Sequence, residues 1–239
     1  MKLLIDIGNT RLKWALTHNI RFESNGVVDN AGITSTILHE HWAKLPRPSS
    51  VGIACVSAEL IFITVTRCLN ELWPAIEIKR LYAQAQCLGV QNAYQHPEKL
   101  GVDRWLALLA AHHSYKGCIG IIDCGTAITI DIVHADGIHV GGYITPGLTL
   151  MQQALSARTG LVSATVQSSL QAGKTTEAAI YAGTLLTAVA LINAVPHLYP
   201  DIDQLILTGG DATTVAQYVS VACHLEVDLV LHGLALAMT

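Results

Sequence analysis

The chain opens with an apolar run of strand type that ends on a carboxylate. Positions 3–5 (Leu-Leu-Ile) lead into Asp6, the small turn Gly8-Asn9-Thr10 follows, and a second apolar segment occupies 12–16. Short apolar runs bounded by a glycine-containing turn are typical of two adjacent strands. The pattern therefore predicts a strand that ends at Asp6, a tight turn, and a second strand.

A second copy of this pattern lies further along the chain. Positions 121–126 (Ile-Ile-Asp-Cys-Gly-Thr) repeat positions 4–9 in order: apolar strand, Asp, one residue, Gly and a small polar residue. Each copy is followed by another short strand ending in small residues, within 51–59 and 204–212. Self-similarity of this kind indicates a duplicated fold. We expect an N-terminal half, 1–116, and a C-terminal half, 117–239, packed around one cleft.

Between these strands the apolar positions recur with helical spacing. Four segments show it, namely 58–73, 103–115, 148–157 and 175–195. Strands that alternate with helices predict mixed sheets covered by helices, which is the α/β class.

One apolar segment is long enough to cross a membrane. Positions 178–195 carry no charge, but they are rich in Ala and include Thr184, Thr187 and Asn193. No basic cluster flanks them to set an orientation in a bilayer. We interpret the segment as a helix buried on nearly all sides in a large core, and we expect no membrane association.

The composition of the chain argues against a nucleic-acid-binding protein and against a secreted one. Apolar residues make up 51% of the chain, charged residues 13%, and the net charge is −4. A nucleic-acid binder usually presents a basic face, so we expect no nucleic acid as partner. The chain begins directly with a strand, without a secretory h-region, and its six cysteines form no CxxC pair. We expect free thiols and a cytoplasmic protein.

The two Asp-x-Gly turns are the strongest chemical signal. Glycine and small residues at a strand end let backbone N–H groups approach phosphate oxygens, and a neighbouring Asp suits a cation that bridges to phosphate. A Walker loop, GxxxxGK[ST], is absent. One such turn alone is more often an ordinary β-turn, but two copies in register favour nucleotide binding.

Two weaker signals accompany the turns. In the stretch Gly101-Val102-Asp103-Arg104, Asp103 stands where a helix begins, so it is either a routine cap or a general base with Arg104 as a carboxylate clamp. The stretch Leu207 to Ala212 (LTGGDA) ends a strand in paired glycines, and it either contacts a nucleoside or caps a helix at Asp211.

The order of motifs DIGNTRLK, HPEKLGVDR, IDCGTA, GGYITPG, KTTEAAIYAG and LTGGD resembles the type III pantothenate kinase family. That family belongs to the superfamily of acetate kinase, sugar kinases, heat-shock ATPases and actin. The resemblance implies an actin-like ATPase fold with two halves around a nucleotide cleft. It also implies ATP-dependent phosphorylation of pantothenate, the first step of coenzyme A biosynthesis, by a homodimer that uses Mg²⁺ and K⁺ or NH₄⁺.

The resemblance also implies roles for individual residues. Asp103 would be the general base, and Asp123 would hold the monovalent cation, while Asp6 would face Mg²⁺. The family often has Asn before its pocket threonine, where this chain has Thr175, a difference that changes the polarity of the pocket and leaves the catalytic set intact. The residues implied in ATP binding are Asp6, Ile7, Gly8, Asn9, Thr10, Arg11, Leu12, Lys13 and Thr126, and those implied in pantothenate binding are Tyr94, Gly101, Val102, Asp103, Arg104 and Thr176.

Three alternatives remain open at this point. A sugar or carboxylate kinase of the same superfamily would share both turns, and a phosphatase would act on polyphosphate or a nucleotide. A non-catalytic nucleotide-binding regulator, such as a transcription accessory protein, would be expected to have lost Asp6, Asp103 or Asp123, and all three are present.

Overall fold

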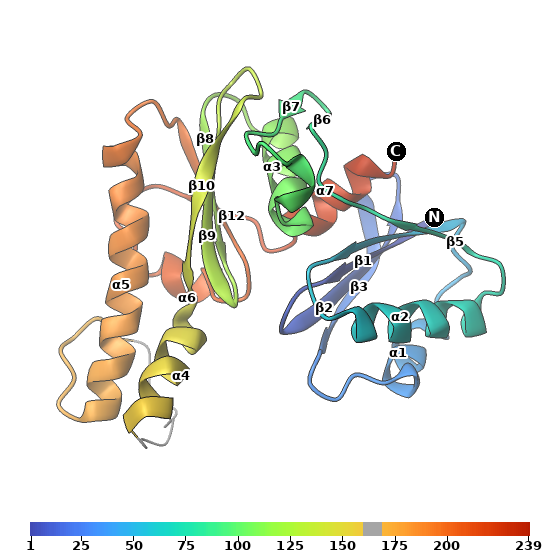
Figure 1. The fold of residues 1–239 in the computed structure, drawn as a ribbon, viewed down its shortest axis with the longest axis horizontal. Helices are drawn as coiled ribbons and strands as arrows, with labels where there is room; N and C mark the ends of the chain where they lie inside the picture. Colours follow the sequence, from blue (N-terminus) through green and yellow to red (C-terminus); the bar gives the residue numbers. More distant parts are fainter. Residues whose placement is uncertain (160–168) are drawn as a thin grey trace. The chain divides into compact units, whose positions relative to one another are not determined.

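The computed structural model describes residues 1–159 and 169–239 (Figure 1). The chain forms two compact units, one built from Met1–His113 together with Leu229–Thr239, the other from Ser114–Asp228.

The first unit contains one large sheet, a small two-stranded sheet and four α-helices in its described residues. Its elements are β1 (Lys2–Ile7), β2 (Arg11–His18), β3 (Arg21–Asp29), α1 (Ser35–Trp42), β4 (Ser50–Cys55), α2 (Glu59–Leu72), β5 (Glu77–Arg80), β6 (Gln86–Cys87), β7 (Val90–Gln91), the 3₁₀ turn η1 (Pro97–Lys99), α3 (Val102–Ser114) and α7 (Leu229–Ala237).

The second unit contains the other large sheet. Its described elements are β8 (Ile119–Cys124), β9 (Ala127–Val133), β10 (His139–Pro146), α4 (Leu148–Thr159), α5 (Thr176–Leu198), β11 (Gln204–Thr208), α6 (Ala212–Ala216) and β12 (His224–Leu225).

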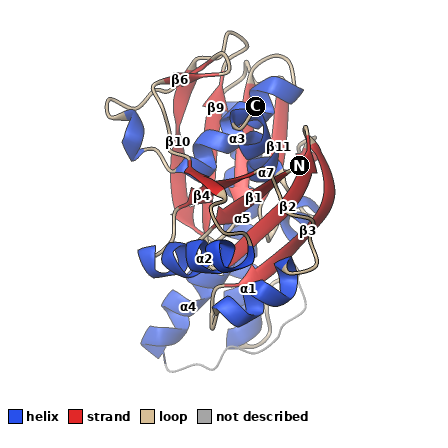
Figure 2. Cartoon of the chain, turned by 90° about the vertical axis from the view of Figure 1, so that its right-hand side faces the viewer, coloured by secondary structure: helices blue, strands red, loops and turns tan. Residues whose placement is uncertain are grey.

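The two large sheets have the same topology. Their strand orders are β3-β2-β1-β4-β5 and β10-β9-β8-β11-β12, with the first three strands antiparallel and the remaining pairs parallel. Strands and helices alternate in both copies, and Figure 2 shows the sheets in red with the helices in blue. The matching order confirms the predicted α/β class and the predicted duplication.

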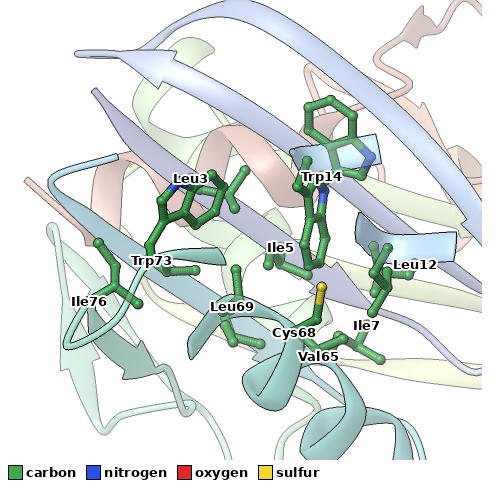
Figure 3. Close-up of a cluster of buried hydrophobic side chains, with 14 of the residues drawn as sticks. Leu3, Ile5, Ile7, Leu12, Trp14, Val65, Cys68, Leu69, Trp73 and Ile76 are labelled. Carbon is green, nitrogen blue, oxygen red and sulfur yellow. The ribbon is translucent and has the colours of Figure 1, made fainter. Parts of the chain in front are cut away.

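The core of the first unit lies between its sheet and helices α1 and α2. Leu3, Ile5 and Ile7 of β1 pack with Cys68 and Leu69 of α2 in one apolar cluster (Figure 3). Each fully buried aliphatic side chain of this kind contributes about 1.5–3 kcal/mol of hydrophobic free energy. All four tryptophans of the chain, at positions 14, 42, 73 and 105, are buried.

Helix α7 packs against the same sheet, on β1, β2 and β4. Gly52 of β4 is close to the Met238 side chain, and Gly233 of α7 lies against the Leu106 backbone of α3. The last eleven residues thus pack with the first unit, whereas the predicted halves 1–116 and 117–239 assign them to the second. As a boundary between the two copies of the repeat, 116/117 stays a prediction.

The expectation that the long apolar helix is buried on nearly all sides is wrong. In α5, buried residues recur as a stripe that includes Ala182, Leu185 and Val189, whereas Leu186 is 54% exposed. Among the described residues it is the one helix long and apolar enough to cross a membrane, and 39% of its most apolar window is buried. Much of its remaining surface is Ala, Gly and Thr, whose small side chains present little apolar area to solvent.

Strand alternation decides which face carries each key aspartate. Successive side chains of a strand point to opposite faces of the sheet. Ile5 and Ile7 belong to the main apolar cluster of the first unit, so Asp6 lies on the opposite face of its sheet. In the second unit, Ile122 and Cys124 belong to the main apolar cluster, so Asp123 also lies on the opposite face. The duplication therefore places both carboxylates at equivalent positions.

Candidate active site

The turn after β1 is fixed by four backbone positions. The Gly8 N–H donates to the Arg11 carbonyl at 3.0 Å, and the Val56 N–H donates to the Ile7 carbonyl at 3.0 Å. A Cβ on Gly8 would lie 3.1 Å from the Arg11 carbonyl oxygen, so a larger residue would crowd the hairpin. Asn9, Thr10 and Arg11 are exposed, which leaves this face of the turn accessible to a ligand.

Asp6 and Lys13 lie directly opposite one another on β1 and β2. Both are half-buried at the sheet end that carries the turn. Cys55, at the matching end of β4, has a raised thiol pKa, chiefly because of burial, with small contributions from Glu59 and Asp6. This thiol therefore stays protonated near neutral pH.

The turn after β8 is built in the same way. The Gly125 N–H donates to the Ala127 carbonyl at 3.0 Å, and the Asp211 N–H donates to the Cys124 carbonyl at 2.8 Å. The register leaves three residues between Cys124 and Ile128, against four between Ile7 and Leu12, so the second hairpin is one residue shorter.

Two glycines pack tightly around this second turn. A Cβ on Gly147 would lie 2.1 Å from the Gly125 carbonyl oxygen, and a Cβ on Gly209 would lie 2.2 Å from Oδ1 of Asp123. Gly209 also has a φ of +94°, a conformation that L side chains rarely adopt. Side chains are therefore excluded at both positions, and the Asp123 carboxylate and the Thr126 backbone are held against glycine.

The surroundings of the second turn are acidic. Burial, followed by the charges of Asp123 and Asp211, raises the pKa of Cys124 to about 12. Asp211 is the residue before α6, but its side chain makes no capping bond to that helix. The side chain of Asp211 therefore does not cap α6, contrary to the capping alternative.

Helix α3 begins with the stretch that carries the predicted base. The Trp105 N–H donates to the Gly101 carbonyl at 3.0 Å, and the Arg104 N–H donates to Oδ1 of Asp103 at 2.8 Å. A Cβ on Gly101 would lie 2.5 Å from that same Oδ1. Glycine at 101 therefore leaves room for the Asp103 carboxylate at the helix N-terminus, where the helix dipole stabilises the anion.

Arg104 is buried and is held by Tyr94. One guanidinium nitrogen, Nη1, donates to the Tyr94 hydroxyl at 2.9 Å, and the guanidinium carbon lies 5.8 Å from the centre of the Tyr94 ring. Only 7% of Arg104 is exposed. The structure thus joins two residues that the sequence assigned to the same substrate.

The loop that carries Tyr94 is organised by Asn92. Its side-chain amide donates to the carbonyls of Gln84 and Pro97 at 3.2 and 3.3 Å, while its Oδ1 accepts from the Tyr94 N–H at 3.0 Å. Asn92 is 8% exposed. Sequence reasoning missed it, although a polar residue two positions before a candidate tyrosine is the available signal.

At the start of α5 the structure separates two neighbouring threonines. Thr175 is the N-cap residue, and its hydroxyl accepts from the Ala178 N–H at 3.2 Å. Thr176 is the first helical residue and is exposed. Capping thus engages Thr175, and substrate contact by Thr176 stays a prediction.

The predicted residues fall into both units. Asp6 to Lys13, Tyr94 and Gly101 to Arg104 belong to the first unit, whereas Asp123, Thr126 and Thr176 belong to the second. No group of three or more His, Cys, Asp or Glu side chains suited to a metal occurs among the described residues. The single carboxylate of Asp6 beside an exposed turn fits Mg²⁺, which takes few protein ligands and completes its shell with phosphate oxygens and water.

Comparison with known proteins identifies relatives over nearly the whole chain. The family model described as type III pantothenate kinase matches residues 2–221. A type III pantothenate kinase of Nitrosococcus oceani is 37% identical, with 98% of this chain and 92% of that protein covered.

Solved structures support the fold. A protein of Sinorhizobium meliloti described as a 2-dehydro-3-deoxygalactonokinase has a TM-score of 0.62 at 15% identity, with 100% of this chain and 96% of that chain covered. A Campylobacter jejuni protein described as a Baf family transcriptional activator has a TM-score of 0.59 at 21% identity, with 97% and 94% covered. Together with the duplicated sheet order, these likenesses confirm the predicted actin-like α/β fold. The chain belongs to the type III pantothenate kinase family.

Proposed function

We propose that this protein transfers the γ-phosphoryl group of ATP to the primary hydroxyl of pantothenate and thereby makes 4′-phosphopantothenate for coenzyme A biosynthesis. Family membership supports the reaction. The start of α3 is the observation that assigns this reaction to particular residues. There a carboxylate, Asp103, is followed directly by a buried arginine, Arg104, whose guanidinium is oriented by Tyr94.

These residues suit the two ends of an acceptor that carries a hydroxyl and a carboxylate. The guanidinium of Arg104 offers donors in a rigid fork that matches a carboxylate, and Tyr94 fixes the direction of that fork. Asp103 accepts the hydroxyl proton as the oxygen attacks the γ-phosphorus. The bond from that phosphorus to the bridging oxygen breaks, and ADP leaves with the electron pair.

The two Asp-x-Gly turns suit the nucleotide. The backbone N–H groups of Asn9 and Arg11 and the Lys13 side chain neutralise phosphate charge, and Thr126 of the second turn contacts ATP. Mg²⁺ beside Asp6 would supply further charge neutralisation on the β- and γ-phosphates. Phosphoryl transfer needs positioning and charge neutralisation more than covalent assistance, and the raised thiol pKa values of Cys55 and Cys124 agree with a site without a thiolate nucleophile.

We further propose that Asp123 holds K⁺ or NH₄⁺ and that the enzyme is a cytoplasmic homodimer. The tight packing of glycine around the Asp123 carboxylate supports an ordered oxygen ligand. One exposed face of α5 combines Leu186, 54% exposed, with the small residues Ala179, Gly183 and Ala190, and this face offers close packing to a second copy. Sedimentation equilibrium that gives the monomer mass at micromolar concentration would contradict the dimer, and turnover unchanged when Na⁺ replaces K⁺ would contradict the monovalent cation.

The regulatory alternative has less support. The Campylobacter jejuni likeness, at 21% identity, carries the fold alone, and the three aspartates that a catalyst needs are present.

The test is an Asp103→Asn variant beside the parent protein. Asparagine keeps the size of the side chain but cannot take the proton, so kcat should fall by about 10²–10⁴-fold while nucleotide binding persists. The matched control is a Glu98→Gln variant, because Glu98 is an exposed acidic residue of η1. Its turnover should equal that of the parent protein. Turnover of the Asp103→Asn variant within threefold of the parent would remove Asp103 from the role of base.

A further inference from the structure

The residue after the third strand contacts the Asp-x-Gly turn in both copies of the fold. In the first copy, the Asn30 N–H donates to the Thr10 carbonyl at 2.8 Å. In the second copy, the Gly147 N–H donates to the Thr126 carbonyl at 2.9 Å. Asn30 follows β3 as Gly147 follows β10, so the two residues are equivalent.

The two copies differ in what this residue does next. The side-chain amide of Asn30 donates to the Gly8 carbonyl at 2.7 Å. At the equivalent place, Gly147 lies so close to the Gly125 carbonyl that a Cβ would be 2.1 Å from its oxygen. The second turn is therefore held by direct backbone packing, whereas the first is held by an asparagine side chain.

Asn30 holds two carbonyls of one turn from the same side. A trans peptide places its N–H opposite to its C=O. Because the carbonyls of Gly8 and Thr10 both face Asn30, the N–H groups of the next residues, Asn9 and Arg11, are directed to the other side of the turn. Two N–H groups that converge on one side form the kind of concavity that binds an anion.

The side chain of Asn30 also contains an unpaired acceptor. Its Oδ1 is buried and makes no hydrogen bond to any residue that the structure describes. A buried acceptor without a partner destabilises a fold, whereas an apolar side chain of the same shape would not. Asn30 thus provides the amide that donates to the Gly8 carbonyl in spite of the unpaired acceptor in the same side chain.

We propose that Asn30 is the positioning residue of the phosphate-binding turn: its amide holds the Gly8 carbonyl and thereby keeps the Asn9 and Arg11 N–H groups directed at the ATP phosphates. This proposal rests on the proposed function. The described residues show the Gly8 carbonyl bonded to Asn30 and not to the Arg11 N–H. Without the amide donor, that carbonyl can accept from Arg11, the usual bond of a two-residue hairpin, and the Arg11 N–H is withdrawn from the phosphates.

The test is an Asn30→Leu variant, which keeps the shape of the side chain and removes both its donor and its unpaired acceptor. The KM for Mg-ATP should rise about tenfold, while the KM for pantothenate at saturating Mg-ATP and the melting temperature stay close to those of the parent. Asn30→Ala gives the same test if the leucine variant folds poorly. Asn25→Leu, at an exposed position of the preceding strand β3, is the matched control and should change neither constant.

The possible outcomes separate the two roles. A selective loss of Mg-ATP affinity supports positioning. A KM for Mg-ATP within twofold of the parent overturns it, and so does a parallel change in both KM values and the melting temperature, which indicates a general structural role. If the parent does not turn over pantothenate, the proposed reaction fails, but calorimetric binding of Mg-ADP to parent, Asn30→Leu and Asn25→Leu still decides the role of Asn30.

Discussion

The bond between Arg104 and Tyr94 gives the most quantitative prediction for the acceptor site. Tyr94→Phe removes one hydroxyl and leaves the aromatic ring beside the guanidinium, 5.8 Å from its centre to the guanidinium carbon. The lost bond is 2.9 Å long, involves a charged donor, and lies where Arg104 is 7% exposed. Hydrogen bonds to charged groups contribute about 1.5–3 kcal/mol.

At about 1.4 kcal/mol for each factor of ten, that range corresponds to about 10- to 150-fold. We expect kcat/KM for pantothenate to fall by about tenfold, near the lower end, because the ring still restricts the guanidinium. The assay is coupled detection of ADP release at saturating Mg-ATP, and the KM for Mg-ATP should not change.

The matched control is Tyr82→Phe. Tyr82 is also a tyrosine beside an arginine, with its ring centre 5.6 Å from the guanidinium carbon of Arg80, but it is 59% exposed. The control should behave like the parent. A Tyr94→Phe variant whose kcat/KM for pantothenate stays within twofold of the parent would refute the claim that Tyr94 orients Arg104.

Two further predictions concern stability. Gly209→Ala combines a φ of +94° with a Cβ placed 2.6 Å from the Cys124 backbone, so chemical denaturation should show that the free energy of unfolding falls by more than about 2 kcal/mol. Gly183→Ala is the control, because the space around its Cβ is open, and it should leave the free energy of unfolding unchanged or raise it. Burial and the hydrogen bond to Glu226 raise the pKa of Tyr115 from 10.0 to about 12, so the folded state holds the phenol proton more strongly than the unfolded state does. The protonated Tyr115 therefore stabilises the fold below pH 10, and this stabilisation is lost as the pH rises towards 12. Tyr115→Phe should flatten that alkaline decline in a series of denaturation curves, and an unchanged decline would contradict the assignment to Tyr115.

Local patterns were sufficient to predict helices α2 to α5, the strands around both Asp-x-Gly turns and the duplication, but not α1, α6, α7 or the outer strands β3, β5 and β12. The two Asp-x-Gly turns follow strands whose side chains point alternately to the buried cluster and to the opposite face of the sheet. Strand periodicity alone therefore determines the face on which Asp6 and Asp123 lie. Helical spacing likewise located α2 and α3 to within two residues. These features depend on neighbours in sequence, which is why they can be read from it.

Long-range packing could not be read in this way. The small residues of α5 are compatible with burial on every side, and only the packing of α5 within its unit decides that one stripe is buried. The same holds for α7, whose contacts with β1 come from the other end of the chain, and for Asn30, which reaches back across the sheet to Gly8. An amide in a loop has many possible partners, and the sequence does not choose among them.

The central claim is that this protein phosphorylates pantothenate. The most direct measurement is ADP release by the purified protein with Mg-ATP and K⁺, with and without pantothenate, together with mass-spectrometric detection of 4′-phosphopantothenate. We predict ADP release that depends on pantothenate and matches the phosphorylated product mole for mole. Equal ADP release without pantothenate would indicate a phosphatase, and a folded protein that binds nucleotide but shows no turnover would contradict the account in favour of a regulator.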